Sequence, residues 1–275
     1  MTTYTIRQLL VDVDAPVTRH WAGGDAFKTA VLDALSMSFP RGEQYFIDSL
    51  KAGALLLPPE AQQAFAQELK GFIGQEATHR HIHTRLNRQL VAMGYNNLLD
   101  ERIARRIQRW AHLNVRQHVA TTAATEHITA LLAGWLLQRP DVLEGAPTAL
   151  KAMWLWHSTE ELEHRSTAFD LYRAIGGHEK GRRLTFWMVT LNFCIDVSLQ
   201  VLSNLWRDGS WKRWGTWRSG WRLLFEKDGL IRGNRKGWSA YLDANFHPSQ
   251  HDASAAQAWL DDNAQLWRTV STQAS

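Results

Sequence analysis

Two segments of the sequence combine glutamate and histidine at helical spacing. The segment QEATHRHIH carries Glu76 and His79, and the segment WHSTEELEH carries His157, Glu161 and His164. Residues three, four or seven positions apart project from the same face of a helix. Carboxylates crowded on an inward face repel one another and lose their hydration unless a cation binds them. The two segments therefore predict metal-binding faces, each with a Glu-x-x-His pair.

Two further glutamates complete a ligand set from four helices. Glu43 lies in FPRGEQYF, and Glu126 lies among small and apolar residues in TTAATEHITALLAGW, a setting that predicts burial. The order Glu, Glu-x-x-His, Glu, Glu-x-x-His is that of ferritin-like di-iron carboxylate bundles. Carboxylates neutralise and bridge two divalent ions, and neutral imidazoles complete the coordination. Such a mixed set favours iron, leaves manganese open and disfavours zinc.

The predicted ligands of the two ions are Glu43, Glu76, His79, Glu126, Glu161 and His164, and His157 lies on the same helix face as the last two. His83 lies one turn further along the second ligand helix, and we expect it to support a ligand. Glu160 is the alternative to Glu161, which we prefer because it also aligns with His157. The competing interpretation is a bundle whose Glu and His faces are solvated, but it does not account for the apolar setting of Glu126.

The helices that position these residues follow from the distribution of proline and glycine. Alternating apolar and polar runs bounded by tight turns are missing after the first twenty residues, which indicates an all-α protein. We expect an interruption at Pro40 and a short strand or extended arm at 4–13. The expected helices cover 25–54, 60–93, 98–137, 147–175 and a segment that starts at 179.

The predicted architecture is a ferritin-like four-helix bundle over residues 1–178. A helical extension rich in Trp and Arg, residues 179–275, is expected to pack on this bundle, so that the chain forms a single domain. The hydrophobic content of 45% is sufficient for a core of this size. Cys194 is the only cysteine, which excludes an intramolecular disulfide and a cysteine-based zinc site. Together with an N-terminus unlike a signal peptide, it predicts a cytoplasmic setting.

The extension has an unusual composition. The run 184–206 is long enough to span a bilayer, but its polar residues, Asp196 and Gln200 among them, recur at helical spacing and favour packing within a protein. Segment 206–238 holds nine Lys or Arg against three acids, with tryptophans between them. Trp with basic neighbours is typical of protein packing and of peripheral contact at the inner membrane surface, and both remain open. No motif predicts nucleic-acid binding.

Several of these segments resemble a known family. FPRGEQYF, QEATHRHIHTRLN, TAATEHITALLAG, WHSTEELEHRSTAFDLY and NFHP are similar to segments of bacterial proteins described as predicted metal-dependent hydrolases, which are placed among ferritin-like proteins. The resemblance covers 20–250 and implies a metal-dependent enzyme. A second resemblance concerns the ligands alone. His157, Glu161 and His164 match the His-x3-Glu-x2-His helix of di-iron arylamine N-oxygenases, which implies seven ligands and two unequal ions.

These observations give three hypotheses for function. The first is a di-iron enzyme that activates O2 to oxidise or oxygenate a small, apolar organic substrate. The second is a metal-dependent hydrolase that uses a metal-bridging water, and a non-catalytic iron-binding protein is the least favoured. The side chains of Tyr45, Phe46, Met153, Trp154 and Trp156 are expected to line an apolar pocket or to belong to the core. A homodimer is left open.

Overall fold

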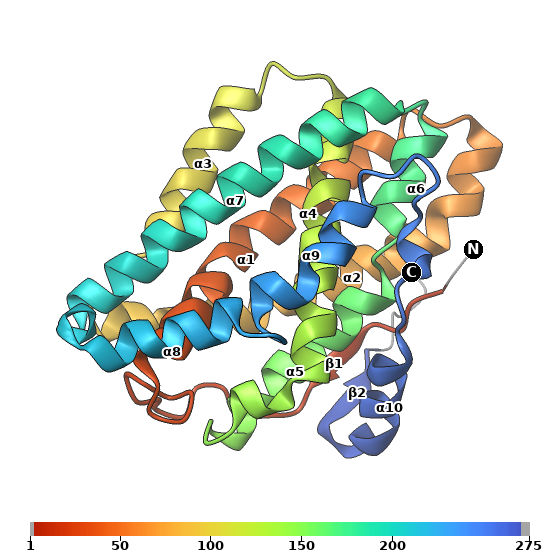
Figure 1. The fold of residues 1–275 in the computed structure, drawn as a ribbon. Coiled ribbons are helices and arrows are strands. Elements are labelled where there is room, and N and C mark those ends of the chain that lie inside the picture. Colours follow the sequence, from red (N-terminus) through yellow and green to blue (C-terminus); the bar gives the residue numbers. More distant parts are fainter. Residues whose placement is uncertain (1–2, 271–275) are drawn as a thin grey trace.

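The computed structural model describes residues 3–270, which fold mostly into helices and so confirm the all-α class (Figure 1). The helices that carry predicted ligands are α1 (Ala26–Ala54), α2 (Pro59–Ala92), α4 (Val115–Gln138) and α5 (Thr148–Glu163). Helix α6 (Thr167–Ala174) follows α5 after a short break. The other helices are α3 (Leu98–Trp110), α7 (Glu179–Arg207), α8 (Trp214–Phe225), α9 (Leu230–Ala240) and α10 (Ser254–Asp262). Two short strands, β1 (Arg7–Leu9) and β2 (Trp267–Thr269), join the ends of the described chain.

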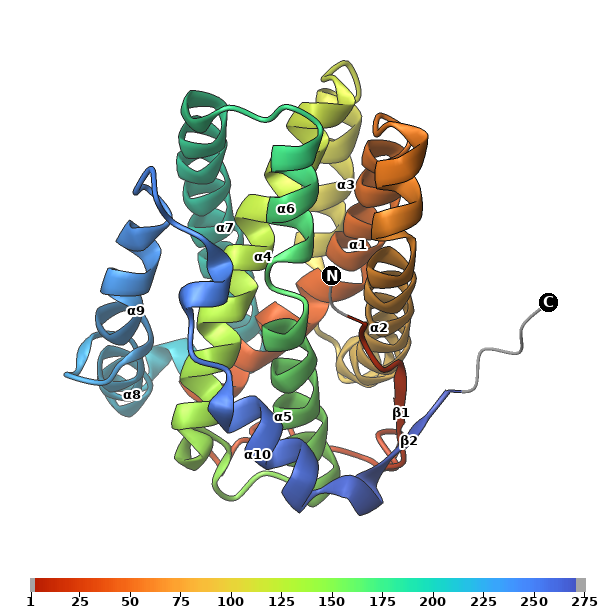
Figure 2. The same ribbon diagram turned by 90° about the vertical axis from the view of Figure 1, so that its right-hand side faces the viewer.

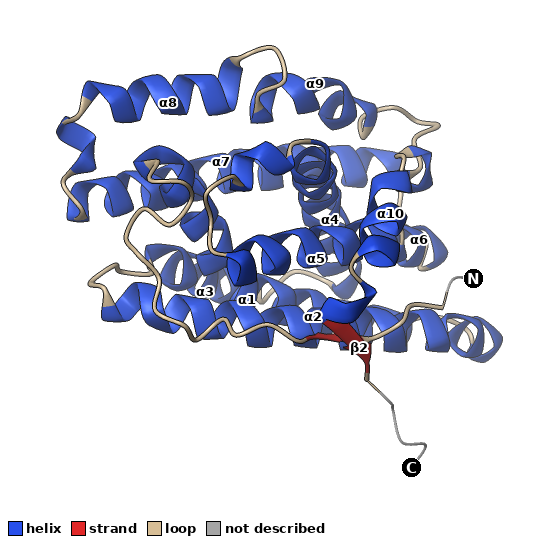
Figure 3. Cartoon of the chain, turned by 90° about the horizontal axis from the view of Figure 1, so that it is seen from below, coloured by secondary structure: helices blue, strands red, loops and turns tan. Residues whose placement is uncertain are grey.

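The ligand helices pack as two pairs around a common core. Helix α1 lies along α2, α4 lies along α5 and α6, and α1 also packs against α4 (Figure 2). Helix α7 packs across α1 and α4, while α3 fills the space beside α1 and α7. Helices α8 and α9 form the outermost layer on the side of α7 (Figure 3). The predicted division at residue 178 falls in the turn between α6 and α7, and it stays a prediction.

Helix α1 continues through Pro40, so the interruption expected there is not a break of the helix. Proline has no backbone N–H, and in a helix it leaves the carbonyl four residues earlier without its donor. Here that carbonyl belongs to Ser36, and it accepts a hydrogen bond of 2.9 Å from the side-chain Nδ2 of Asn87 on α2. A side chain from the neighbouring helix therefore replaces the missing donor, which lets α1 present one continuous face.

Two helices predicted as continuous are each divided in the structure. The predicted helix 98–137 is divided into α3 and α4, because Asn114 begins α4 with a reciprocal cap that involves Gln117. The predicted helix 147–175 is divided into α5 and α6 after His164, where the sequence has no glycine or proline. At this break the guanidinium of Arg165 donates to backbone carbonyls of Leu162, Pro248 and His251. The second division therefore depends on contacts that are remote in sequence.

The N-terminal arm contains the strand that the sequence predicted over 4–13, but only three residues of it are a strand. β1 pairs antiparallel with β2, with Arg7 opposite Thr269 and Leu9 opposite Trp267. The arm then lies on α2, where Gly71 leaves room for Tyr4: a Cβ at Gly71 would come within 2.8 Å of the Tyr4 Cβ. The close approach of arm and helix brings Arg7 to the interior.

Helix α7 is long and apolar enough to cross a membrane by length and composition. Its polar stripe nevertheless packs inward, as the spacing of Asp196 and Gln200 indicated. The carboxylate of Asp196 binds two arginines of α3. The side chain of Gln200 donates hydrogen bonds to Asn204 and to the backbone carbonyl of Asn96, and it accepts one from the backbone N–H of Leu99. The helix therefore covers the core with its polar side as well as with apolar residues.

Candidate metal centre

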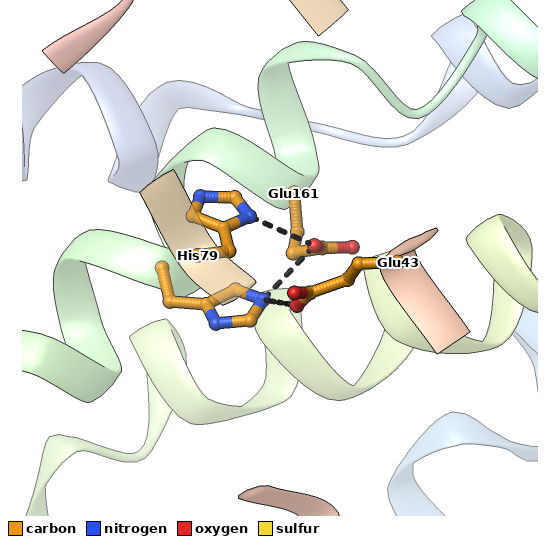
Figure 4. A group of neighbouring side chains, drawn as sticks. Glu43, His79 and Glu161 are labelled. Atoms are coloured by element: carbon orange, nitrogen blue, oxygen red, sulfur yellow. Dashed lines mark hydrogen bonds and ion pairs between the residues drawn. The ribbon is translucent and has the colours of Figure 1, made fainter. Parts of the chain in front are cut away.

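Four helices deliver the predicted ligands to one buried centre. Glu43 comes from α1, Glu76 and His79 from α2, Glu126 from α4, and His157 and Glu161 from α5; His164 directly follows α5. None of the seven side-chain positions is more than 3% exposed. Figure 4 shows Glu43, His79 and Glu161 converging from different helices.

Two groups of these residues have ligand atoms close enough to hold a metal ion. One group is Glu43, His79, His157 and Glu161, and the other is Glu76, His79, Glu161 and His164. Within each group the candidate atoms lie within 4.8 Å of one another. His79 and Glu161 belong to both groups, so these two residues lie between the two positions. The buried Glu and His residues could thus bind a pair of metal ions.

Glu126 is the one predicted ligand outside these two groups. Its Oε2 lies 2.9 Å from Nδ1 of His164, and its other oxygen has no hydrogen-bond partner. Glu126 is therefore joined to the second group through His164. The structure brings all seven residues together, with Glu126 at the edge of the centre.

The centre concentrates buried polar atoms that have no hydrogen-bond partner within the protein. Among residues 3–270, seventeen buried side-chain nitrogen and oxygen atoms lack a hydrogen bond, and eight of them belong to the predicted ligands. Both oxygens of Glu43 and Glu76 are among the eight. The others are Nδ1 of His79, Oε1 of Glu126, Oε2 of Glu161 and Nε2 of His164. Buried polar groups are nearly always paired, so this cluster of acceptors fits metal cations.

The pKa shifts at the centre also indicate that the buried carboxylates lack a cation. Burial, and then repulsion from Glu161, raises the pKa of Glu43 and of Glu76 well above the usual range of a carboxyl group. Burial also raises the pKa of Glu126 to about 7, although His164 lowers it in part. For Glu161, burial is outweighed by His157 and His164, and its pKa is lowered. A divalent cation would stabilise the ionised form of every one of these carboxylates.

Glu160 contacts a predicted ligand and lies outside both groups of candidate ligand atoms. Its Oε2 lies 2.9 Å from Nε2 of His79, and its Oε1 accepts a hydrogen bond of 3.0 Å from Arg7 of β1. A proton held on Nε2 leaves Nδ1 of His79, which faces the centre, free to bind a metal. Burial raises the pKa of Glu160 to about 8, and Arg7 opposes this rise. The Arg7 guanidinium also donates to the carboxylate of Glu163 at 2.7 and 2.8 Å, so one cation contacts two carboxyl groups.

His83 orients His157 through a chain of hydrogen bonds whose direction is fixed. The Ser36 hydroxyl donates to Oδ1 of Asn87, so it can only accept from Nδ1–H of His83. Nε2 of His83 then accepts from Nδ1–H of His157, at 2.7 Å. Nε2 of His157 then faces the centre, 2.9 Å from Glu161 and 3.8 Å from Glu43, where a metal ion would take the place of its proton. The chain thus presets the tautomer in which His157 can bind a metal.

The sequence analysis missed three of these supporting residues. Arg7 lies far from the ligands in the chain, and no local pattern marks it. Asn87 and Ser36 were also missed, although Pro40 was a signal, because a proline within a helix requires a donor for the carbonyl of residue 36. His83, which was expected to support a ligand, contacts His157, and Glu160, the alternative to Glu161, contacts His79.

Two apolar cavities lie beside the centre. The smaller one, about 40 Å³, is lined by His157 and Glu161, and the larger one, about 120 Å³, is lined by Glu43. Phe39, Thr129 and Leu132 line both cavities. Space for a small organic molecule therefore adjoins the candidate ligands.

The aromatic residues expected near a pocket divide between the cavities and the core. Tyr45 and Phe46 line the larger cavity, and Trp154 lines the smaller one. Met153 and Trp156 are core residues with at most 1% of their surface exposed. The Trp156 ring also packs edge-on against His79, with 5.0 Å between ring centroids, and restricts the orientation of that imidazole.

Comparison with known proteins agrees with the donor set. The curated proteins and the solved structures gave no match to this chain. One family model matches residues 5–252, a range that contains all seven predicted ligands, the supporting residues Arg7, His83 and Glu160, and the cavities. The chain belongs to the family that this model describes, the predicted metal-dependent hydrolases.

Proposed function

We propose that this protein is a di-iron enzyme with a ferritin-like arrangement of α1, α2, α4 and α5–α6. Glu43, His157 and one side of Glu161 would hold one ion, and Glu76, His164 and the other side of Glu161 would hold the second. His79 lies within reach of both ions, and Glu126 would join the second through its unpartnered oxygen. The observation that carries this proposal is the set of eight unpartnered buried atoms on these residues.

The proposed reaction is oxidation or oxygenation of an apolar organic molecule. Two ferrous ions supply the electrons with which O2 is reduced. The carboxylates of the centre would offset the positive charge of the two ions, and the three imidazoles would complete the coordination. The apolar walls of the cavity beside Glu43 would bind the substrate and exclude water from the centre.

Hydrolysis is the second candidate, and the description of the family favours it. In that reaction two ions would lower the pKa of a bound water. The apolar cavities argue for the oxidative alternative, since a hydrolase must also bind the polar group that it cleaves. The two candidates therefore differ in a property that can be measured directly, the response of the reduced protein to O2.

The deciding experiment begins with the metal content of protein expressed in iron-replete medium. Anaerobic loading with Fe(II) and stopped-flow mixing with O2 would follow. We expect about two irons per chain and a transient visible absorption after mixing. Two bound metals without any response to O2 would support hydrolysis instead. Protein that binds no metal would refute both candidates.

A pair of matched variants tests the ligand assignment. Glu76→Gln removes a buried carboxylate whose oxygens have no hydrogen-bond partner, and we expect the chain to lose about one bound iron. Glu60→Gln makes the same substitution at an exposed position of the same helix, and it should retain both ions. Equal metal content in the two variants would contradict the role of Glu76.

A further inference from the structure

The larger cavity beside the centre adjoins a second, open cavity at the surface. The walls of the larger cavity include the buried Glu43 and also Arg106, Trp110 and Asn192. The same three residues line an open cavity of about 210 Å³ between α3 and α7. The open cavity therefore shares a wall with the cavity that Glu43 lines.

The open cavity is strongly cationic. Arg102, Arg105, Arg106 and Arg109 line it from one face of α3. Arg102 and Arg106 bind the same buried carboxylate, Asp196, at 2.5 and 2.6 Å. In the part of the chain that the structure describes, Arg105 and Arg109 form no ion pair with any carboxylate, and both are exposed. Four guanidinium groups thus line a cavity that has no carboxylate among its lining residues, and the one acid that binds two of them, Asp196, lines the larger cavity instead.

We propose that the substrate is an amphiphilic organic anion, with its acidic group at Arg105 and Arg109 and its apolar part in the cavity beside Glu43. Guanidinium groups bind carboxylates and phosphates with directed hydrogen bonds. The cavity that follows is almost entirely apolar, so it suits an alkyl or aryl group and not a second charge. This inference rests on the proposed function and specifies its substrate class.

The test compares octanoate with octanamide, its neutral analogue, as ligands of the metal-loaded protein. Isothermal titration calorimetry would measure both dissociation constants for wild type and for Arg105→Gln/Arg109→Gln. We expect octanoate to bind more tightly than octanamide, and the double variant to weaken octanoate alone, by about tenfold. Arg88→Gln/Arg268→Gln removes the same charge from exposed positions outside this cavity, and it should bind octanoate as the wild type does.

Three results would overturn this substrate class. They are equal affinity for the two ligands, equal weakening in the control variant, and no saturable binding of octanoate at millimolar concentration. The metal content of each sample is measured in parallel. If the proposed metal centre does not exist, the wild-type protein will contain no metal. That result is distinguishable from a failure of the arginine cluster to select an anion, which would leave the metal content unchanged.

A second observation concerns the outer side of α7. Only 28% of its most apolar stretch is buried. The exposed apolar residues recur at helical spacing and are each 44–68% exposed: Leu184, Trp187, Leu191, Ile195, Leu202 and Trp206. The opposite side carries the buried Asp196 and Gln200. An apolar stripe of this length on the surface is typical of an interaction site.

The stripe continues into α8, where charge accompanies the aromatic residues. Trp214 is 79% exposed and Trp221 is 64% exposed. Both α7 and α8 pack on α1 and lie on the same side of the molecule (Figure 2). Exposed basic residues of this segment include Lys212, Arg213 and Arg218. Tryptophan with basic neighbours suits the interface between lipid headgroups and acyl chains.

We infer that the outer sides of α7 and α8 bind the surface of an anionic membrane. Segment 206–238 has nine basic and three acidic residues, an excess that anionic lipid complements. A second copy of the chain fits less well, because a symmetric contact would bring two positive surfaces together. Asn192 of the cationic cavity lies on α7, so a membrane-derived amphiphile would reach that cavity over a short path.

Co-sedimentation with vesicles tests this surface. We expect the metal-loaded protein to bind vesicles of phosphatidylcholine and phosphatidylglycerol, and to bind pure phosphatidylcholine about tenfold less. Trp214→Ser/Trp221→Ser should abolish binding to the mixed vesicles. Leu55→Ser/Leu56→Ser, at exposed apolar residues between α1 and α2, should bind as the wild type does. Absence of binding to anionic vesicles, or a lipid-free dimer that the tryptophan variant disrupts, would overturn the inference.

Discussion

Replacing Arg7 tests whether the N-terminal arm controls the metal centre. Arg7 is 6% exposed and is the cation that the buried Glu160 contacts, at 3.0 Å. At about pH 9 the wild-type Glu160, whose pKa burial raises to about 8, is ionised, whereas in Arg7→Gln the loss of that charge would raise the pKa further and keep the carboxyl protonated. A protonated Glu160 can donate to Nε2 of His79, which shifts the imidazole proton to Nδ1 and blocks the nitrogen that faces the centre.

The size of both effects follows from these contacts. Breaking a buried ion pair by removing one partner costs about 3–5 kcal/mol of folding stability. Loss of a hydrogen-bonded support of a metal ligand lowers affinity by about 10- to 100-fold. We expect Arg7→Gln to show both changes, the first in urea unfolding of the metal-free protein and the second in competition with a chelator at about pH 9, where the wild-type Glu160 is ionised.

Two controls separate orientation of His79 from general damage. Arg268→Gln removes an exposed arginine from β2, the strand paired with β1, and should leave metal affinity unchanged. Glu160→Gln retains an oxygen that accepts from His79, so it should weaken metal binding less than Arg7→Gln does. An Arg7→Gln protein that is less stable but binds metal with wild-type affinity would refute the reasoning, because Arg7 would then act on the fold alone.

Three further predictions concern the fold and the supports of the centre. Burial raises the pKa of Asp33 to about 7, so the folded chain retains a proton that the unfolded chain loses, and stability falls as pH rises from about 4 to 7. Asp33→Asn retains an acceptor for Trp21, so it should be more stable than wild type at about pH 8, by at most about 4 kcal/mol, and equally stable at about pH 3. Urea unfolding at both pH values checks this prediction. A difference in stability that is the same at both pH values would contradict it. Gly71→Ala should destabilise the protein by about 1–3 kcal/mol, since the added Cβ would lie within 2.8 Å of Tyr4; unchanged thermal unfolding would show that the arm yields without cost. Ser36→Ala removes the group that sets the tautomer of His83 and should weaken metal binding about tenfold in chelator competition, whereas unaltered affinity would mean that His157 needs no preset tautomer.

The sequence predicts the ligand positions well because the relevant geometry is local. A Glu-x-x-His pair on a helix lies on one face whatever surrounds the helix, and Glu76, His79, Glu161 and His164 do meet at one centre. The preference for Glu161 over Glu160 also depended on local spacing, and the structure places Glu161 in both ligand groups. Identity of the metal does not follow from spacing and stays a prediction.

The errors in the predicted fold have two different origins. The start of α4 was marked locally, since Asn114 and Gln117 have the spacing of a reciprocal cap, and that signal was overlooked. The continuity of α1 through Pro40 depends on Asn87 of another helix, and the break after His164 depends on carbonyls near Pro248. Contacts between remote residues decide these two points, so no window of neighbouring sequence can predict them.

The pairing of β1 with β2 has a consequence for the order of events during synthesis. All seven candidate ligands lie before residue 165, whereas β2 begins at Trp267. A ribosome therefore releases the ligand helices well before the strand that holds the arm bearing Arg7 in place. Because domains fold progressively from the N-terminus, a nascent chain would present an open form of the centre to incoming metal. Closure of the arm over α2 would then act as the last step of maturation and retain the ions once the chain is complete.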